Sequence, residues 1–282
     1  MNILTFDIEE WFHLLDKNLL NTETSWDTFE VRIHKNMERI FRILEEKDAK
    51  ASFFCLGWIA KKYPEIIKQI DQLGYEIGCH SDQHQLVYKQ TPALFKKDTE
   101  IAINRLEDIL GKKITAYRAP CFSITPDTKW AFEVLAELGI THDSSIFPSI
   151  RQKGGYPGFP VTTPSIVNTN GIQIKELPIT TTKLLGQEIV FSGGGYFRFF
   201  PYPLIKHWTE KQEYVMTYLH PRDLDADQPM IKALSFTRKF KSYYGLHAAE
   251  AKFEHWLSDF KFLDIKEFDD NFDWKKAPIV NL

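Results

Sequence analysis

Residues 51–79, ASFFCLGWIAKKYPEIIKQIDQLGYEIGC, contain the pattern that decides the fold class. The apolar runs at the two ends of this stretch predict two buried strands. Between them, residues 58–73 have the periodicity of a helix, with Pro64 near its start and Gly74 as its C-terminal stop. A strand, a helix and a second strand in this order indicate parallel strands joined by a right-handed crossover.

The alternation continues on both sides of this stretch. Residues 2–6 predict a first strand, and residues 33–44 predict a helix with one buried face. Further along, residues 91–110 and 125–139 predict helices separated by a short strand at 116–118. Either an open parallel sheet or a closed barrel would accommodate this pattern. Because no G-x-G-x-x-G follows the first strand, we favour the barrel.

The second half of the chain is less regular. Residues 148–178 are rich in glycine and proline and predict an irregular insertion over the active face. A late strand is expected at 214–219, followed by an amphipathic helical tail. We therefore expect a barrel over residues 1–225 and a helical extension, packed on the barrel, over residues 226–282.

Composition excludes some classes of function. A net charge of -3 over 282 residues gives no basic face for nucleic acid. The N-terminus does not resemble a signal peptide, and no apolar run is long enough to span a bilayer. The three cysteines are far apart and form no CxxC pair. These features predict a cytoplasmic protein without disulfides or a transmembrane segment.

Two acids, Asp7 and Glu9, directly follow the first predicted strand. Buried carboxylates are costly unless they are paired or bound to a metal. Because side chains alternate along a strand, both should project to the same side. One could bind a metal while the other acts as a base, and the pattern leaves open which does which.

Two histidines, His80 and His84, follow another predicted strand in the segment HSDQH. On a helical turn the i, i+4 spacing places both imidazoles on one face, where they could bind one metal. The third ligand should then be a carboxylate, which Asp7 or Glu9 could supply. Two further strand ends carry Arg118-Ala119-Pro120 and His220-Pro221, so Arg118 could orient a carboxylate and His220 could protonate a leaving amine. Together these residues predict metal-assisted hydrolysis of an amide or ester.

At this point the sequence resembles the polysaccharide deacetylases, the NodB-like group also called carbohydrate esterase family four. The resemblance rests on five motifs in the family's order: Thr5-Phe6-Asp7, His80-Ser81-x-x-His84, Arg118-x-Pro120, Asp143-Ser144-Ser145 and Leu219-His220. It implies a distorted (β/α)7 barrel and a divalent metal, most often Zn²⁺. It also implies an N-acetylated oligo- or polysaccharide as the substrate.

The resemblance also implies individual roles. Asp7 would be the catalytic base held by Arg118, and His80 and His84 would bind the metal. His220 would be the general acid, and Asp143 would orient His220 or pair with Arg118.

The family's first motif usually has two adjacent aspartates, but here Ile8 replaces the second. We therefore assign the ligand role to Glu9, with Asp7 as the alternative. Pro120 and Cys121 would line the substrate site, where the backbone N–H at Cys121 would be the oxyanion donor.

A narrower similarity is to the subgroup found in bacterial exopolysaccharide gene clusters. The segments that carry it are FDIEEWF, GWIAKKYPEIIKQI, RAPCFSIT, DSSIFP and SGGGYFRFFP. It implies an amino sugar of an exopolysaccharide or of its lipid-linked precursor. We further expect Tyr196 and Arg198, in the glycine-rich segment, to touch the ligand.

Two other functions fit the same residues. One is hydrolysis of another C–N bond, in a small cyclic amide or a formamide, on the same barrel. The other is a catalytically inactive protein that binds carbohydrate, which the substitution at Ile8 favours. The retention of the acids, both histidines, Arg118 and His220 argues against the inactive protein.

Overall fold

The computed structural model describes residues 1–13, 26–151, 153–231 and 234–282. The described strands are β1 Asn2–Ile3, β2 Thr5–Ile8, β3 Ser52–Cys55, β4 Glu76–Cys79, β5 Ala116–Tyr117, β6 His142–Asp143, β7 Ser165–Thr169, β8 Ile172–Glu176, β9 Thr181–Leu184, β10 Gln187–Val190, β11 Val215–Met216, β12 Phe262–Leu263 and β13 Ile279–Asn281. The α-helices are α3 Ile33–Glu46, α4 Gly57–Lys62, α5 Pro64–Gln72, α6 Pro92–Leu110, α7 Trp130–Glu137, α8 Gly194–Phe199, α9 Tyr202–Glu210, α10 Phe236–Tyr243, α11 Leu246–Asp259 and α12 Ile265–Asn271. None of the helices in these residues is both long and apolar enough to cross a membrane.

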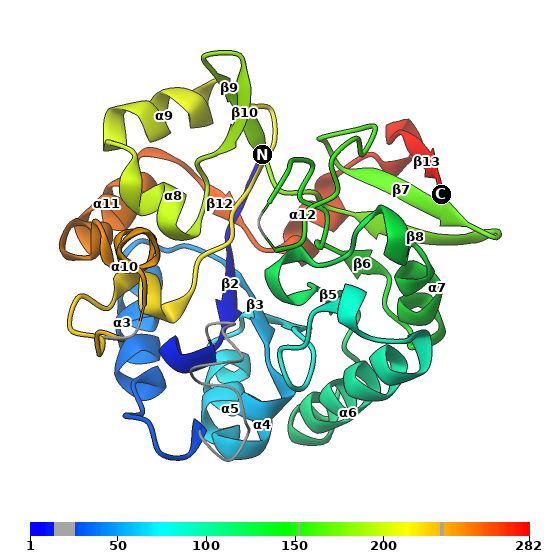
Figure 1. The fold of residues 1–282 in the computed structure, drawn as a ribbon, viewed down its shortest axis with the longest axis horizontal. Coiled ribbons are helices and arrows are strands. Elements are labelled where there is room, and N and C mark those ends of the chain that lie inside the picture. Colours follow the sequence, from blue (N-terminus) through cyan, green and yellow to red (C-terminus); the bar gives the residue numbers. More distant parts are fainter. Residues whose placement is uncertain (14–25, 152, 232–233) are drawn as a thin grey trace.

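A parallel sheet forms the centre of the molecule, as the strand–helix alternation predicts. Strands β2, β3, β4, β5, β6 and β8 lie side by side in that order, and all of these neighbours are parallel. Helices α3 to α7 surround these strands (Figure 1). The predicted mixed α/β class is therefore confirmed.

Strand β1 continues the line of β2 and pairs with β11 and β12. An isolated parallel bridge joins Phe6 of β2 to Leu219, downstream of β11. In the described residues no ladder joins β8 to β11, so hydrogen-bonded strand pairs alone do not close the sheet into a barrel.

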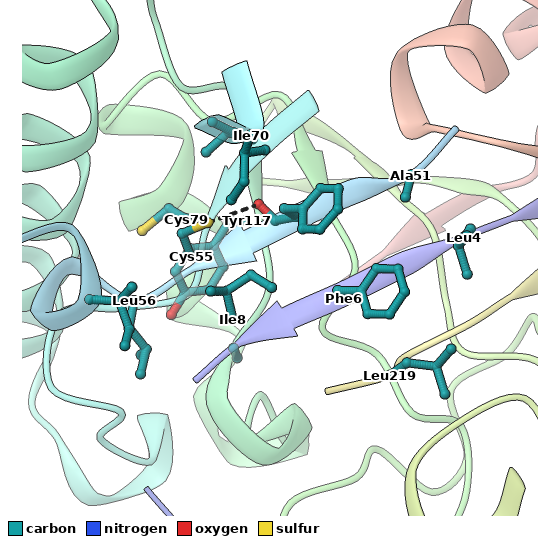
Figure 2. Close-up of a cluster of buried hydrophobic side chains, with 14 of the residues drawn as sticks. Leu4, Phe6, Ile8, Ala51, Cys55, Leu56, Ile70, Cys79, Tyr117 and Leu219 are labelled. Atoms are coloured by element: carbon teal, nitrogen blue, oxygen red, sulfur yellow. Dashed lines mark hydrogen bonds between the residues drawn. The ribbon is translucent and has the colours of Figure 1, made fainter. Parts of the chain in front are cut away.

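The core on the sheet is built by alternating side chains of the strands. Figure 2 shows Phe6 and Ile8 of β2 beside Leu219, Cys55 and Cys79, all without solvent exposure. Apolar side chains of β2 therefore face this core while Asp7, between Phe6 and Ile8, faces the other way.

Two predicted elements differ from the structure. The helix expected over residues 58–73 is broken into α4 and α5 at Tyr63, because the residue before Pro64 is disfavoured in helical backbone. Residues 148–178 are not irregular throughout, since β7 and β8 form an antiparallel hairpin there. Its turn is Asn170-Gly171, and both residues have positive φ.

The C-terminal region contains more than the predicted helices. Strand β12 pairs with β1, and β13 pairs with β7 on the other side of the molecule. Ion pairs from Arg39 and Arg42 to Glu250 join α3 to α11, and α12 lies near the centre of the view in Figure 1. Residues 226–282 thus contribute strands to both larger sheets as well as helices.

Candidate metal centre and active site

Two buried carboxylates stand at the carboxyl end of β2. The side chain of Asp7 lies within the strand and that of Glu9 directly after it, and both are almost fully buried. Asp7 Oδ1 accepts a hydrogen bond of 2.8 Å from Arg118 Nη1. Although burial alone would raise the pKa of Asp7, the Arg118 guanidinium and nearby histidines hold this pKa below its usual value. Asp7 is therefore ionised at neutral pH.

The two histidines of the HSDQH segment come together without a helix. They follow β4 in an irregular turn in which Ser81 has φ 67 and His84 has φ 53. The His84 N–H donates to Ser81 Oγ at 3.0 Å, which fixes the turn. The predicted proximity is present, with ring centroids 5.3 Å apart. The helical turn expected to produce it is wrong, because left-handed residues bring the rings together instead.

A backbone contact fixes the tautomer of His80. His80 Nδ1 lies 2.7 Å from the carbonyl oxygen of Arg118. A carbonyl can only accept, so Nδ1 carries the proton and Nε2 has a free lone pair. Burial lowers the pKa of His80 to about 4, which keeps the ring neutral at pH 7. Both features suit a metal ligand.

Glu9, His80 and His84 form a buried cluster of possible ligands. One atom from each lies within 4.8 Å of the other two. His84 Nε2 is 2.9 Å from Glu9 Oε2, yet Glu9 Oε2 has no hydrogen-bond partner. The two atoms are close, but their geometry does not suit a hydrogen bond. We infer that both are directed at one position where a cation could lie. One carboxylate and two imidazoles match the ligand types and open coordination of catalytic zinc sites, so the residues fit a divalent metal.

Arg118 is fully buried and connects several strands. Its Nη1 donates to Asp7 Oδ1 and, at 2.7 Å, to Thr5 Oγ1. Its Nε and Nη2 donate to the backbone oxygen and Oγ of Ser144 at 3.1 and 2.9 Å. The guanidinium carbon lies 4.3 Å from the ring centroid of Phe54. These contacts leave the guanidinium little freedom, so it holds Asp7 in one orientation.

His220 also lies close to both carboxylates. Its Nε2 lies 3.8 Å from Asp7 Oδ2 and 3.7 Å from Glu9 Oε1. Its Nδ1 is 2.8 Å from Asp223 Oδ2. Burial would lower the pKa of His220, but Asp223 outweighs this and raises the pKa to about 9. His220 is therefore protonated at neutral pH and can donate a proton from Nε2.

The carboxylate that orients His220 is Asp223, which the sequence reasoning did not identify. Asp143, in β6, accepts from Ser145 Oγ at 2.6 Å and stands opposite Glu176 in the neighbouring strand, and the charge of Arg118 also acts on it. No hydrogen bond joins Asp143 to Arg118 or His220 among the described residues. The spacing His-x-x-Asp after the last strand is the signal that could have indicated Asp223, because the structure places both residues on one short turn.

Arg198 does not line a ligand site, contrary to the expectation. Its side chain is buried, and Nε donates to Asp223 Oδ1 at 3.1 Å. The glycine-rich segment packs so closely that a Cβ at Gly193 would lie 2.0 Å from the backbone oxygen of Tyr218. Close packing therefore explains this glycine. Tyr196, by contrast, is 44% exposed and remains available to a ligand.

The segment expected to supply the backbone N–H for the oxyanion forms a short 3-10 helix, Pro120–Phe122. Pro120 is buried, and Cys121 has φ 54, in the left-handed region. Burial raises the pKa of the Cys121 thiol to about 11, so the thiol is protonated and unsuited to act as a nucleophile.

Two family models match parts of this chain. Residues 18–142 match the family model for polysaccharide deacetylases, and residues 144–269 match a domain of unknown function, DUF3473. The first match contains His80, His84 and Arg118, and the second contains His220.

Two curated relatives have named activities. A peptidoglycan-N-acetylglucosamine deacetylase of Bacillus cereus is 34% identical over 34% of this chain and 35% of its own length. A chitooligosaccharide deacetylase of Azorhizobium caulinodans is 30% identical over 36% of this chain and 49% of its own length. The chain thus spans less than half the length of these relatives.

A solved structure supports the fold over the whole chain. The crystal structure of a candidate polysaccharide deacetylase from Mycobacterium smegmatis aligns with a TM-score of 0.66, at 19% identity. The alignment covers 100% of this chain and 92% of that one. Over residues 18–142, less than half of its length, the chain is similar to the polysaccharide deacetylase family.

Proposed function

We propose that this protein hydrolyses the N-acetyl group of an amino sugar within a polysaccharide, with a divalent metal held by Glu9, His80 and His84. Zinc suits this ligand set best. The observation that carries the proposal is the buried cluster of these side chains, with Asp7 and the protonated His220 close to it. A site that only bound sugar would need neither two buried histidines beside a carboxylate nor a histidine with a raised pKa.

Each residue of the site would have a separate role in the hydrolysis. A metal held by Glu9, His80 and His84 would supply Lewis acidity toward the amide carbonyl and toward water. Asp7, ionised and held by Arg118, accepts the proton of the attacking water. His220 donates a proton from Nε2 to the departing amine, and Asp223 keeps the imidazole in that orientation. The backbone N–H of Cys121 would stabilise the developing oxyanion, in a segment that Pro120 makes rigid.

We propose as the substrate an N-acetylated exopolysaccharide or its lipid-linked precursor. The names of the curated relatives support an N-acetylated glycan, because those proteins act on peptidoglycan and on chitooligosaccharide. Tyr196 is the exposed aromatic residue of the glycine-rich segment and could stack on a sugar ring.

The test combines metal content with acetate release. Purified wild type, His84→Ala and His207→Ala would be reconstituted with zinc and assayed on an N-acetylglucosamine oligomer. His207 is exposed on α9 and serves as the matched control. We expect stoichiometric metal and acetate release in the wild type and the control, and loss of both in His84→Ala. Metal without acetate release would favour another C–N substrate, and failure of the wild type to bind zinc would favour a binding protein.

A further inference from the structure

Helix α10, Phe236–Tyr243, is oriented with its aromatic side toward solvent. Phe236 is 84% exposed, Phe240 is 42% exposed, and Tyr244, directly after the helix, is 49% exposed. Their spacing of four residues places them along one side. No residue of α10 is buried. Surface helices of globular proteins normally turn their apolar side toward the core. Helix α10 instead turns its apolar side toward solvent.

Polar contacts hold α10 in this orientation. Arg198 donates to the backbone oxygens of Lys241 and Tyr244 at 3.1 and 2.7 Å. Arg222 donates to the backbone oxygen of Ser242 at 3.4 Å. Both arginines are buried, and cations are favourable at the C-terminal carbonyls of a helix. The helix is thus anchored through its carbonyl groups, which leaves its aromatic side uncovered.

The exposed rings continue onto α8. Phe199 is 49% exposed, and its ring centroid lies 6.2 Å from that of Phe240 and 5.9 Å from that of Tyr244. The Phe240 and Tyr244 centroids are 4.6 Å apart. We call Phe199, Phe236, Phe240 and Tyr244 the aromatic face. Contiguous exposed apolar side chains of this kind mark interaction surfaces.

The charge around the aromatic face indicates its partner. Helix α10 has the sequence FTRKFKSY, with three basic residues and no acid, although the whole chain has a net charge of -3. Lys241 is exposed, and no ion pair joins Lys239 or Lys241 to an acid in the described part of the chain. Aromatic rings beside lysines suit the interface of a bilayer that contains anionic lipids.

The shape also favours a membrane over a glycan. Sugars and other small ligands are generally held in concave sites. The aromatic face instead lies on a helix at the outer edge of the view in Figure 1, and no residue of this helix is buried. An exposed helix can insert its rings among lipid headgroups, whereas it encloses a sugar poorly.

We propose that the aromatic face docks this protein on the surface of a membrane containing anionic phospholipid. The docking helix is connected to the active site, because the Arg198 guanidinium that holds α10 also donates to Asp223, the partner of His220. Docking would therefore bring the active site to a glycan carried on a membrane lipid. That last step rests on the proposed deacetylase function, whereas the membrane binding does not.

The test is co-sedimentation of the full chain with lipid vesicles. We expect wild type to bind vesicles containing phosphatidylglycerol, to bind pure phosphatidylcholine vesicles less, and to dissociate at high salt. Phe236→Ser/Phe240→Ser should weaken binding at least about tenfold, because two rings no longer enter the interface. Leu185→Ser, at a 97% exposed position in the β9–β10 hairpin, should bind as wild type does. Equal thermal unfolding of both variants would show that folding is unaffected.

Several outcomes would overturn the proposal. One is that the wild type does not bind anionic vesicles, and another is that the wild type and the double variant bind them equally. A third is that the wild type forms a dimer and the double variant is a monomer. Displacement of the wild type from vesicles by a soluble glycan would also contradict it, since the face would then be a sugar site. Vesicle binding requires no catalysis, so failure here leaves the acetate-release test independent.

Discussion

Asp7 and Glu9 are separated by one residue, yet their neighbours give them different properties. Arg118 donates to Asp7, while His84 lies beside Glu9. The Glu9 oxygen nearest to His84 lies 2.9 Å from His84 Nε2 without well-formed hydrogen-bond geometry, so both atoms could bind one cation. Asp7 Oδ1 is occupied by the guanidinium, and its other oxygen faces His220. At the scale of single residues, these contacts favour Glu9 as the ligand and Asp7 as the base.

Asp223 controls the protonation of His220. Because His220 acts as an acid only while protonated, acetate release by the wild type should fall as pH rises through about 9, the pKa of this histidine. Asp223→Asn removes the charge that raises the pKa, so the alkaline fall in kcat/KM should move to lower pH. Asp227→Asn, in an exposed carboxylate nearby, should leave the profile unchanged. An unshifted alkaline limb in Asp223→Asn would contradict this role.

Most residues of the site were predictable from the sequence. The residues that hold them in position, Asp223 beside His220 and Ser144 beside Arg118, were not identified. Asp7 lies near the end of a strand, and Glu9, His80, His84, Arg118 and His220 follow strands, so the parallel fold brings them to one edge. Asp223 was missed because no role was assigned to the His-x-x-Asp spacing, although both residues lie on one short turn. The role of Ser144 was missed because its contact with Arg118 joins residues 26 apart, which no local pattern indicates. Arg198 was placed at the ligand because an arginine beside exposed aromatics gives no sign that its side chain turns inward.

At the scale of elements, a carboxylate from a distant loop caps α3. Glu10 Oε1 accepts from the N–H groups of Arg32 and Ile33 at 2.7 and 2.8 Å. The N-terminal residue of α3 provides no side-chain cap of its own. Glu10 therefore satisfies free N–H groups at a helix start and ties α3 to the segment that carries Glu9.

Glu10→Ala should lower the free energy of unfolding by about 1–3 kcal/mol, because buried N–H groups lose their acceptor. Urea denaturation would measure this change. Glu38→Ala, at an exposed position of the same helix, should change the free energy of unfolding by less than about 0.5 kcal/mol. Equal effects of the two substitutions would show that Glu10 does not cap the helix.

At the scale of the whole molecule, repeated strand–helix units were predictable and the long-range pairing was not. Periodicity identifies α3, α6 and the strands between them, because each buries one regular face. Strand β12 has two residues and pairs with β1 across most of the chain, and such short strands have no readable alternation. The β7–β8 hairpin did carry a signal, Asn170-Gly171, within a stretch that its prolines made look irregular.

The central claim, that Glu9 binds the metal and Asp7 acts as the base, is tested most directly by zinc titration of two variants. Asp7→Asn and Glu9→Gln would be compared with wild type by competition with a chelator, alongside acetate release. We predict that Asp7→Asn keeps stoichiometric zinc but loses acetate release, whereas Glu9→Gln loses zinc binding. Zinc lost from Asp7→Asn and retained by Glu9→Gln would contradict the account, because Asp7 would then be the ligand.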